Sequence, residues 1–288
     1  MTKKLIGYGK SYASFGEIVQ GRLSNEEDFL VTIPVDMWST CELICEVVDE
    51  PSTVKVNLYK SRLVAKQMLK YLNLEFGYKI TINFTRNIPI GKGLSSSTAD
   101  MLAVVRAFQE VFGIIVSETF ISRLFSEIEP HDGLHYYMSV AYNHRQGRIL
   151  NKLNHIPDYT IIAIDSGGEI STTEYNNKIK FSNKDLFDYD NIYNDLLVAF
   201  SNRNDEEIAK CAHRSTLKHI ERTDNVLLSK MVQIFADISA IGVIAAHSGT
   251  CGGFLLPSTA SERFINDIKA EAANLGRVFQ TKTLKILL

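Results

Sequence analysis

Three consecutive serines at the end of a glycine-rich loop are the residues of this chain best suited to chemistry. They belong to the segment PIGKGLSSSTAD, residues 89–100, which follows the hydrophobic stretch YKITINF at residues 78–84. Residues 98–111 carry apolar side chains at helical spacing, so a helix is predicted to begin at the serines. Glycine lets a loop approach a ligand closely, and the first turn of a helix presents free amides at the positive end of its dipole. The segment is therefore predicted to bind an anion, of which phosphate is the usual one.

A second glycine-rich segment, GVIAAHSGTCGGFLLP at residues 242–257, accompanies this loop. Apolar stretches flank its centre, which predicts two strands with the glycines at a tight connection between them. Each segment taken alone also fits a plain turn, because Gly and Ser are common in turns. The first loop is not the G-x-x-x-x-G-K-[ST] motif of P-loop NTPases, since Lys92 is followed by Gly93. The pattern indicates a phosphate-binding loop of another type.

The composition limits the class of protein. The chain has 288 residues, 45% of them hydrophobic and 22% charged, as is typical of globular proteins. A formal net charge of −2 argues against nonspecific binding to nucleic acid or to an anionic membrane. No apolar run approaches the ~20 residues that cross a bilayer, and the first residues lack the apolar stretch of a signal peptide. The four cysteines form no C-x-x-C pair, which favours reduced thiols and a cytoplasmic protein.

The periodicity of apolar residues predicts two α+β units that join near residues 154–158. The first unit, residues 1–154, is predicted to hold strands at residues 5–11, 16–23, 29–34, 40–48, 78–84, 139–143 and 148–153, and helices at residues 59–74, 98–111 and 117–127. The second unit, residues 155–288, is predicted to hold a strand at residues 159–165, helices up to residue 239, a strand pair within residues 241–257, a helix at residues 260–274 and a strand at residues 278–287. This order suits a ferredoxin-like fold.

Three motifs, in this order along the chain, resemble those of the GHMP kinase superfamily. They are SYASFGEIVQG at residues 11–21, PIGKGLSSSTA at residues 89–99 and HSGTCGG at residues 247–253. GEIVQG beside IPVD, the short EPHD at residues 129–132 and AHSGTCGG are most similar to the L-threonine kinase branch, which is linked to cobalamin side-chain synthesis. The resemblance implies an α+β, two-domain GHMP kinase fold. Its N-terminal domain, residues 1–154, would be like domain 2 of ribosomal protein S5, and its C-terminal domain, residues 155–288, would be ferredoxin-like.

The resemblance also implies an ATP- and Mg²⁺-dependent kinase that phosphorylates an alcohol group of a small amino acid, with L-threonine as the first choice. Ser97 and Glu129 would hold Mg²⁺, and Asp132 would accept the proton of the substrate hydroxyl. Glu17, Gln20 and Asp36 would bind the acceptor, and a loop with Gly167 and Gly168 would close over it. ATP would be bound by Pro89, Gly91, Lys92, Gly93, Leu94, Ser95, Ser96, Ser97 and Thr98 of the loop and by Ser248, Gly249 and Thr250 of the second segment.

Several alternatives stay open at the level of sequence. Glu129 and Asp132 also fit a solvated acidic turn, and His131 stands where a small hydroxyl residue is expected, so it either points away or contacts the substrate. His131 and His135 have a spacing found in zinc sites, but no third ligand is evident. The alternative functions are a homoserine kinase and a nucleotide-binding regulator without catalysis. A homodimer is compatible with the resemblance, although no interface signature is evident.

Overall fold

The computed structural model describes residues 4–168, 181–246 and 250–285. The strands in these ranges are β1 (Lys4–Arg22), β2 (Asp28–Pro51), β3 (Thr53–Lys55), β4 (Phe76–Arg86), β5 (Val140–Asn143), β6 (Arg148–Lys152), β7 (Tyr159–Asp165), β8 (Gly242–Ala245), β9 (Cys251–Pro257) and β10 (Arg277–Lys282). The helices are α1 (Tyr59–Tyr71), α2 (Ser96–Phe112), α3 (Glu118–Ser126), α5 (Asn183–Ser201), α6 (Asp205–Thr223), α7 (Val226–Phe235) and α8 (Glu262–Ala272). None of these helices is both long enough and apolar enough to cross a membrane.

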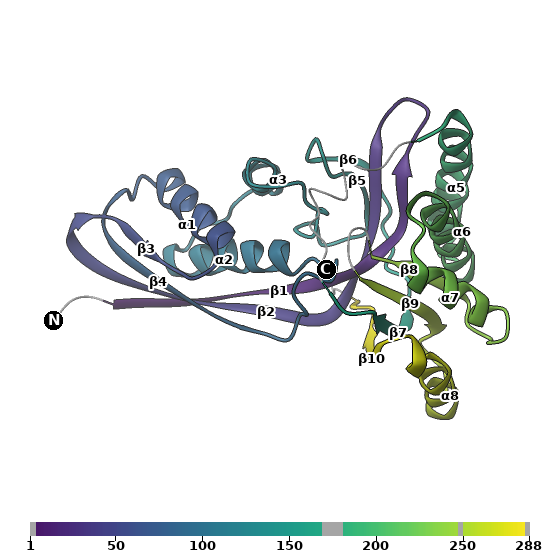
Figure 1. Ribbon diagram of the computed structural model, residues 1–288. Coiled ribbons are helices and arrows are strands. Elements are labelled where there is room, and N and C mark those ends of the chain that lie inside the picture. The colour runs from purple at the N-terminus through teal and green to yellow at the C-terminus, as the bar shows by residue number, and fades with distance from the viewer. Residues whose placement is uncertain (1–3, 169–180, 247–249, 286–288) are drawn as a thin grey trace.

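One mixed sheet runs through the described part of the chain, with strand order β10-β7-β9-β8-β1-β2-β4-β3, and β5 and β6 form a side branch on β2. Figure 1 shows how β1 and β2 run as long strands from the N-terminal end of the molecule toward α5 and α6. The sheet continues across the expected join because β1 pairs with β8, with Glu17 opposite Ala245. The division of the chain at residues 154 and 155 therefore stays a prediction.

Two pairs of predicted strands are single strands in the structure. The stretches 5–11 and 16–23 both belong to β1, and the stretches 29–34 and 40–48 both belong to β2. The pairing of β1 with β2 changes register between Tyr12 and Ala13 and again between Ser14 and Val19. Such bulges bend a strand without ending it, and they re-aim side chains, so the periodicity breaks while the strand continues. The irregular part of β1 is the segment that carries Ser14 and Glu17.

Helices α1 and α2 cover one face of the strands β1, β2, β4 and β3 (Figure 1). Helix α2 lies very close to β1, because a Cβ added at Gly9 would lie only 1.8 Å from the backbone oxygen of Ala103. Buried apolar residues of α1, α2, β2 and β4 form one core there, including Val64, Leu43 and Ile80. This packing holds the start of α2, and with it the serine loop, against the irregular part of β1.

The second half of the sheet is buried on both faces, as the uniform apolar character of β7 indicates. Ile161 and Ala163 face a core shared with β1, α5 and α6, whereas Ile162 and Ile164 face α7 and α8. The second glycine segment differs from the prediction, because Gly252 and Gly253 lie within β9 and not in the connection before it. A Cβ at Gly253 would lie 2.7 Å from Ile161 and 2.8 Å from the ring of Phe15, so close packing of β9 explains this glycine.

Candidate active site

The serine loop ends in an unusual helix start. Helix α2 begins at Ser96, and Ser95 is its N-cap residue with left-handed backbone angles, φ 56° and ψ 27°. A residue other than glycine rarely adopts this conformation outside functional sites. The side chain of Ser95 makes no capping hydrogen bond to the first turn. The first-turn amides of α2 therefore stay available to an anion, and the Ser95 hydroxyl points elsewhere.

The Ser95 hydroxyl donates to Asp132. Its Oγ lies against Asp132 Oδ2, and Ser14 Oγ of β1 donates to the same oxygen at 3.1 Å while contacting Ser95. Asp132 is 7% exposed, and its Oδ1 is buried without a hydrogen-bond partner among the described residues. Burial raises the pKa of this carboxyl, and the hydrogen bonds from Ser95 and Ser14 oppose the shift only in part. The structure thus orients one oxygen of Asp132 and leaves the other open for a proton or a donor.

Glu17 is a second buried carboxyl close to Asp132. It is 5% exposed, and its Oε2 has no partner among the described residues. Its pKa is raised well above the usual value, first by burial and then by the charge of Asp132. Gly16 brings this part of β1 against β8, since a Cβ there would lie 2.6 Å from the backbone oxygen of Ala245. Two neighbouring buried carboxyls with free oxygens indicate that a ligand with a positive charge belongs beside them.

The two predicted magnesium ligands lie in contact. Ser97 Oγ, in the first turn of α2, donates to Glu129 Oε1 at 2.6 Å, and Lys60 of α1 donates to Glu129 Oε2. A hydroxyl and a carboxylate side by side fit the preference of Mg²⁺ for a few protein oxygens combined with waters and phosphate oxygens. The Lys60 ammonium neutralises this carboxylate in the protein alone. The residues present therefore fit a Mg²⁺ ion bound together with phosphate.

His131 lies inside the protein, on the turn between Glu129 and Asp132. It is 3% exposed, and its Nε2 contacts Tyr142 Oη at 3.0 Å and Ser126 Oγ at 3.2 Å. Burial lowers its pKa to about 4, so the imidazole is neutral at physiological pH. The side chain braces the turn from behind, which accounts for a large residue where a small hydroxyl was expected.

The lysine of the loop reaches the second half of the chain. Lys92 Nζ lies 3.0 Å from Asp165 Oδ2 and 2.5 Å from the backbone oxygen of Gly168, and it donates to Thr250 Oγ1 at 3.4 Å. Thr250 and Gly168 were both predicted at the site, and the structure brings both to the loop through Lys92. Ser248 and Gly249 lie outside the described residues.

Other predicted residues lie farther from the chemistry in their contacts. Asp36 is exposed and accepts a hydrogen bond from Trp38 Nε1 at 2.6 Å. Gln20 is buried, and its backbone amide donates to Ser215 Oγ at 3.2 Å. Within the loop, the side chains of Leu94 and Thr98 are buried, so these residues face a ligand with their backbone. Gly91 and Gly93 have positive φ angles of 69° and 72°, which explains the glycines of the loop.

Three residues at the site were missed by the sequence analysis. Ser14 lies inside the first motif, and its hydroxyl could have been included with that motif. Asp165 ends an otherwise apolar strand just before Gly167, and a carboxylate at the end of a buried strand is a usable signal. Lys60 carries no signal of its own, because a lysine at the start of an amphipathic helix is ordinary. Its place beside Glu129 depends on the packing of α1 against the loop.

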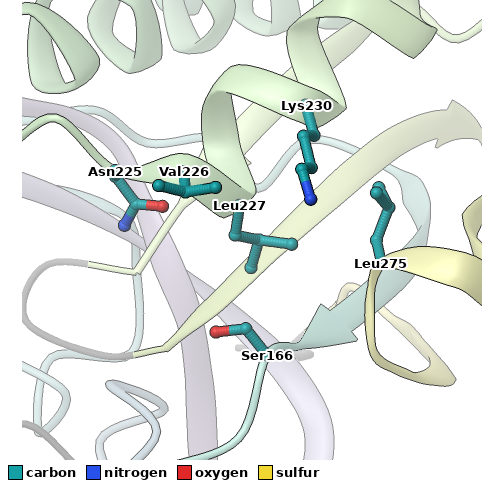
Figure 2. Close-up of a pocket in the computed structure, with 6 residues that line it drawn as sticks. All are labelled: Ser166, Asn225, Val226, Leu227, Lys230 and Leu275. Atoms are coloured by element: carbon teal, nitrogen blue, oxygen red, sulfur yellow. The ribbon is translucent and has the colours of Figure 1, made fainter.

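A cavity of about 350 Å³ lies elsewhere, in the second half of the chain (Figure 2). It is lined by Ser166, Asn225, Val226, Leu227, Lys230 and Leu275. Figure 2 shows Lys230 reaching down from α7 above the end of β7. None of these residues belongs to the serine loop or contacts Asp132 in the described hydrogen bonds, so this cavity is separate from the site built around the loop.

Comparison with known proteins agrees with the geometry. Residues 58–138, which include the serine loop, Glu129 and Asp132, match the model of the GHMP kinases N terminal domain. The chain is a GHMP-type kinase. As a kinase it is a phosphotransferase, and its domain boundary near residue 58 coincides with the start of α1.

Relatives of this kinase extend over most of its length. It is 23% identical over 255 residues to an L-threonine kinase of Salmonella typhimurium, covering 85% of this chain and 81% of that protein. Its fold is similar to the crystal structure of the Methanococcus jannaschii mevalonate kinase, with a TM-score of 0.70, 16% identity and 99% of each chain covered. A homoserine kinase from Cytophaga hutchinsonii gives a TM-score of 0.70 at 14% identity, with 96% of this chain and 94% of that chain covered. These structures establish the GHMP kinase fold.

Proposed function

We propose that the protein transfers the terminal phosphoryl group of ATP to the hydroxyl of a small amino acid, with L-threonine as the first choice. The observation that carries this proposal is the pair of buried carboxyls, Glu17 and Asp132, each with one oxygen that has no partner among the described residues. A base for the hydroxyl and an anion for an ammonium, side by side, are what a hydroxyl-bearing amino acid requires. The relatives named L-threonine kinases support the same choice.

ATP would lie along the serine loop. The first-turn amides of α2 and the positive end of its dipole would face the triphosphate, because the Ser95 side chain leaves those amides free. Ser97 and Glu129 would hold Mg²⁺ with the phosphates, and the ion would neutralise charge that develops on the phosphate oxygens. Lys60, which pairs with Glu129 in the protein alone, is placed to add a positive charge beside the same phosphates.

Asp132 would accept the proton of the acceptor hydroxyl through Oδ1. Its other oxygen is held by Ser95 and Ser14, so the carboxylate has one orientation. The raised pKa of Asp132 brings it nearer to neutrality, where a general base is most effective. Because phosphoryl transfer needs little covalent help, orientation of the hydroxyl and neutralisation of charge would supply most of the rate.

Glu17 would bind the ammonium of the amino acid. An ammonium placed there would give Glu17 Oε2 the partner that it lacks and would restore its ionised state. An acceptor without a positive charge, such as mevalonate or galactose, would leave the carboxyl unpaired, which costs binding energy. L-homoserine also carries an ammonium and a hydroxyl, so homoserine kinase is the second candidate, and the homoserine kinase fold neighbour keeps it in view.

The experiment is a measurement of ADP release from MgATP with L-threonine, L-serine, L-homoserine, mevalonate and galactose as acceptors. We expect stimulation by an amino acid and most by L-threonine. Stimulation by mevalonate or galactose alone would overturn the assignment of an amino-acid acceptor. ATP binding without stimulation by any of the five would favour the regulator over the enzyme of this substrate class.

Two further aspects follow from the same resemblance. The four cysteines, Cys41, Cys45, Cys211 and Cys251, are buried free thiols, which supports a reducing compartment and hence the cytoplasm. O-phospho-L-threonine as product would place the enzyme in cobalamin side-chain synthesis, as in the branch that its motifs resemble. Detection of the phosphorylated amino acid by mass spectrometry would test the product directly.

A further inference from the structure

The glycine-rich loop carries its only lysine between Gly91 and Gly93, and this ammonium is fully occupied within the protein. An ammonium has three N–H donors and no acceptor. Lys92 has three acceptors at hand: Asp165 Oδ2 at 3.0 Å, the Gly168 backbone oxygen at 2.5 Å and Thr250 Oγ1 at 3.4 Å. All three lie in the second half of the chain, more than 70 residues away along the sequence. No donor is left over for a phosphate oxygen.

The acceptors form a built receptor for this ammonium. Thr250 Oγ1 donates to Asp165 Oδ1 at 2.8 Å, and the backbone amide of Gly167 donates to the same oxygen at 2.9 Å. Burial would raise the pKa of Asp165, but the hydrogen bonds from Thr250, Gly167 and Lys92 outweigh it and hold the pKa below its usual range. Asp165 is therefore ionised and oriented independently of Lys92, with its second oxygen directed at the ammonium.

The pair is also shielded from water. The side chain of Lys92 is 14% exposed and that of Asp165 is 12% exposed, in contrast to the surface pair of Arg214 and Asp195, at 43% and 58%. Exposed pairs contribute little, whereas a shielded pair with satisfied hydrogen bonds loses much when one partner is removed. The contact therefore has the energy to restrain a loop that contains two glycines with positive φ angles.

We propose that Lys92, Asp165 and Thr250 form a latch that holds the phosphate loop in its ATP-binding shape, and that Lys92 is not itself a phosphate ligand. Asp165 and Thr250 are then positioning residues that act on ATP through Lys92. This inference rests on the proposed function only in that the loop binds ATP. It predicts that ATP affinity depends on residues at the end of β7 and the start of β9.

The test compares Lys92→Met, Asp165→Asn and the double variant in equilibrium binding of MgATP and in steady-state kinetics. We expect each single variant to weaken MgATP binding about tenfold, equivalent to ~1.4 kcal/mol, and the double variant to be no weaker than either. The KM for ATP should rise while kcat at saturating ATP and the KM for the acceptor change little. Asp195→Asn, which breaks the exposed pair with Arg214, is the matched control and should bind as the wild type does.

A phosphate-ligand role for Lys92 predicts the opposite sign for Asp165. Asp165→Asn would then free the ammonium and leave MgATP binding unchanged or tighter, while Lys92→Met alone weakens it, and this result would overturn the latch. Thr250→Val and Thr250→Ser provide a milder pair, in which only the valine should weaken binding. A Thr250→Val protein with wild-type melting temperature and wild-type ATP affinity would also overturn it. A wild-type protein that fails to bind MgATP would instead contradict the proposed function.

Discussion

The two ends of the phosphate loop are built in opposite ways. At the serine end, Ser95 and Ser97 meet the carboxyls Asp132 and Glu129, and Asp132 keeps an oxygen without a partner among the described residues. At the lysine end, every N–H of Lys92 has an acceptor. The pKa of Asp132 is raised by burial, whereas hydrogen bonds lower that of Asp165. Both ends carry charge, but only one end is left unsatisfied.

This difference separates chemistry from scaffolding. A buried polar atom without a partner costs free energy in the protein alone, and a ligand or a proton can recover that cost. A saturated cluster gains nothing further from a ligand, and its effect is to fix the shape of the backbone. We therefore expect changes at the serine end to alter turnover and acceptor binding, and changes at the lysine end to alter ATP affinity alone.

The largest effect is expected from Asp132→Asn. An amide cannot accept the proton of the acceptor hydroxyl, so kcat should fall about 10³-fold, within the range of general-base contributions. MgATP affinity should stay within about twofold, because Asp132 contacts the loop through Ser95 and Ser14 alone among the described hydrogen bonds. Turnover is measured as ADP release and affinity by equilibrium binding. An active Asp132→Asn enzyme would refute the assignment of the base.

Glu17→Gln should have the next largest effect. Loss of the buried charge that faces the ammonium should raise the KM for the amino acid at least ~30-fold, the equivalent of about 2 kcal/mol. The preference for L-threonine over 3-hydroxybutyrate, which lacks the ammonium, should shrink by a similar factor. Asp36→Asn provides the contrast, since Asp36 is exposed and contacts Trp38. A large change in KM with Asp36→Asn and none with Glu17→Gln would exchange their roles.

Ser97→Ala tests the magnesium end of the site. Loss of the hydroxyl removes one oxygen ligand and the hydrogen bond that orients Glu129, so half-maximal activity should require about tenfold more Mg²⁺. The readout is the rate as a function of free Mg²⁺ at a fixed concentration of ATP. Ser96→Ala is the neighbouring comparison, and its Mg²⁺ dependence should shift less. Equal shifts in the two variants would mean that the hydroxyl of Ser97 has no special role.

Acidification should act on the two ends unequally. Asp132 must be ionised to act as a base, and its raised pKa means that it takes up a proton at a higher pH than an ordinary aspartate. Asp165 has a lowered pKa, so it stays ionised and the contact with Lys92 persists as the pH falls. From about pH 8 to about pH 5, kcat should fall several-fold while MgATP affinity changes less. A parallel decline of both quantities would contradict the distinction.

The local elements of the fold were largely predictable. The helices around residues 59–71, 98–111 and 118–126 follow from apolar periodicity, and Ser117 caps the third of them as expected, accepting from the Phe120 amide at 3.2 Å. The extents of β1 and β2 were not predictable, because bulges interrupt the alternation without ending the strand. β3 escaped notice because three residues are too few to show a period.

The site was predictable to the level of its loops and motifs. Residue type and local spacing alone indicated the helix start at the serines and the glycines that a phosphate loop requires, since both depend on neighbours along the chain. The pairing of Ser97 with Glu129, of Ser95 with Asp132 and of Lys92 with Asp165 was decided by tertiary structure. These contacts join segments that the bulged β1 and the packing of α2 bring together, and the burial that shifts their pKa values exists only in the folded chain.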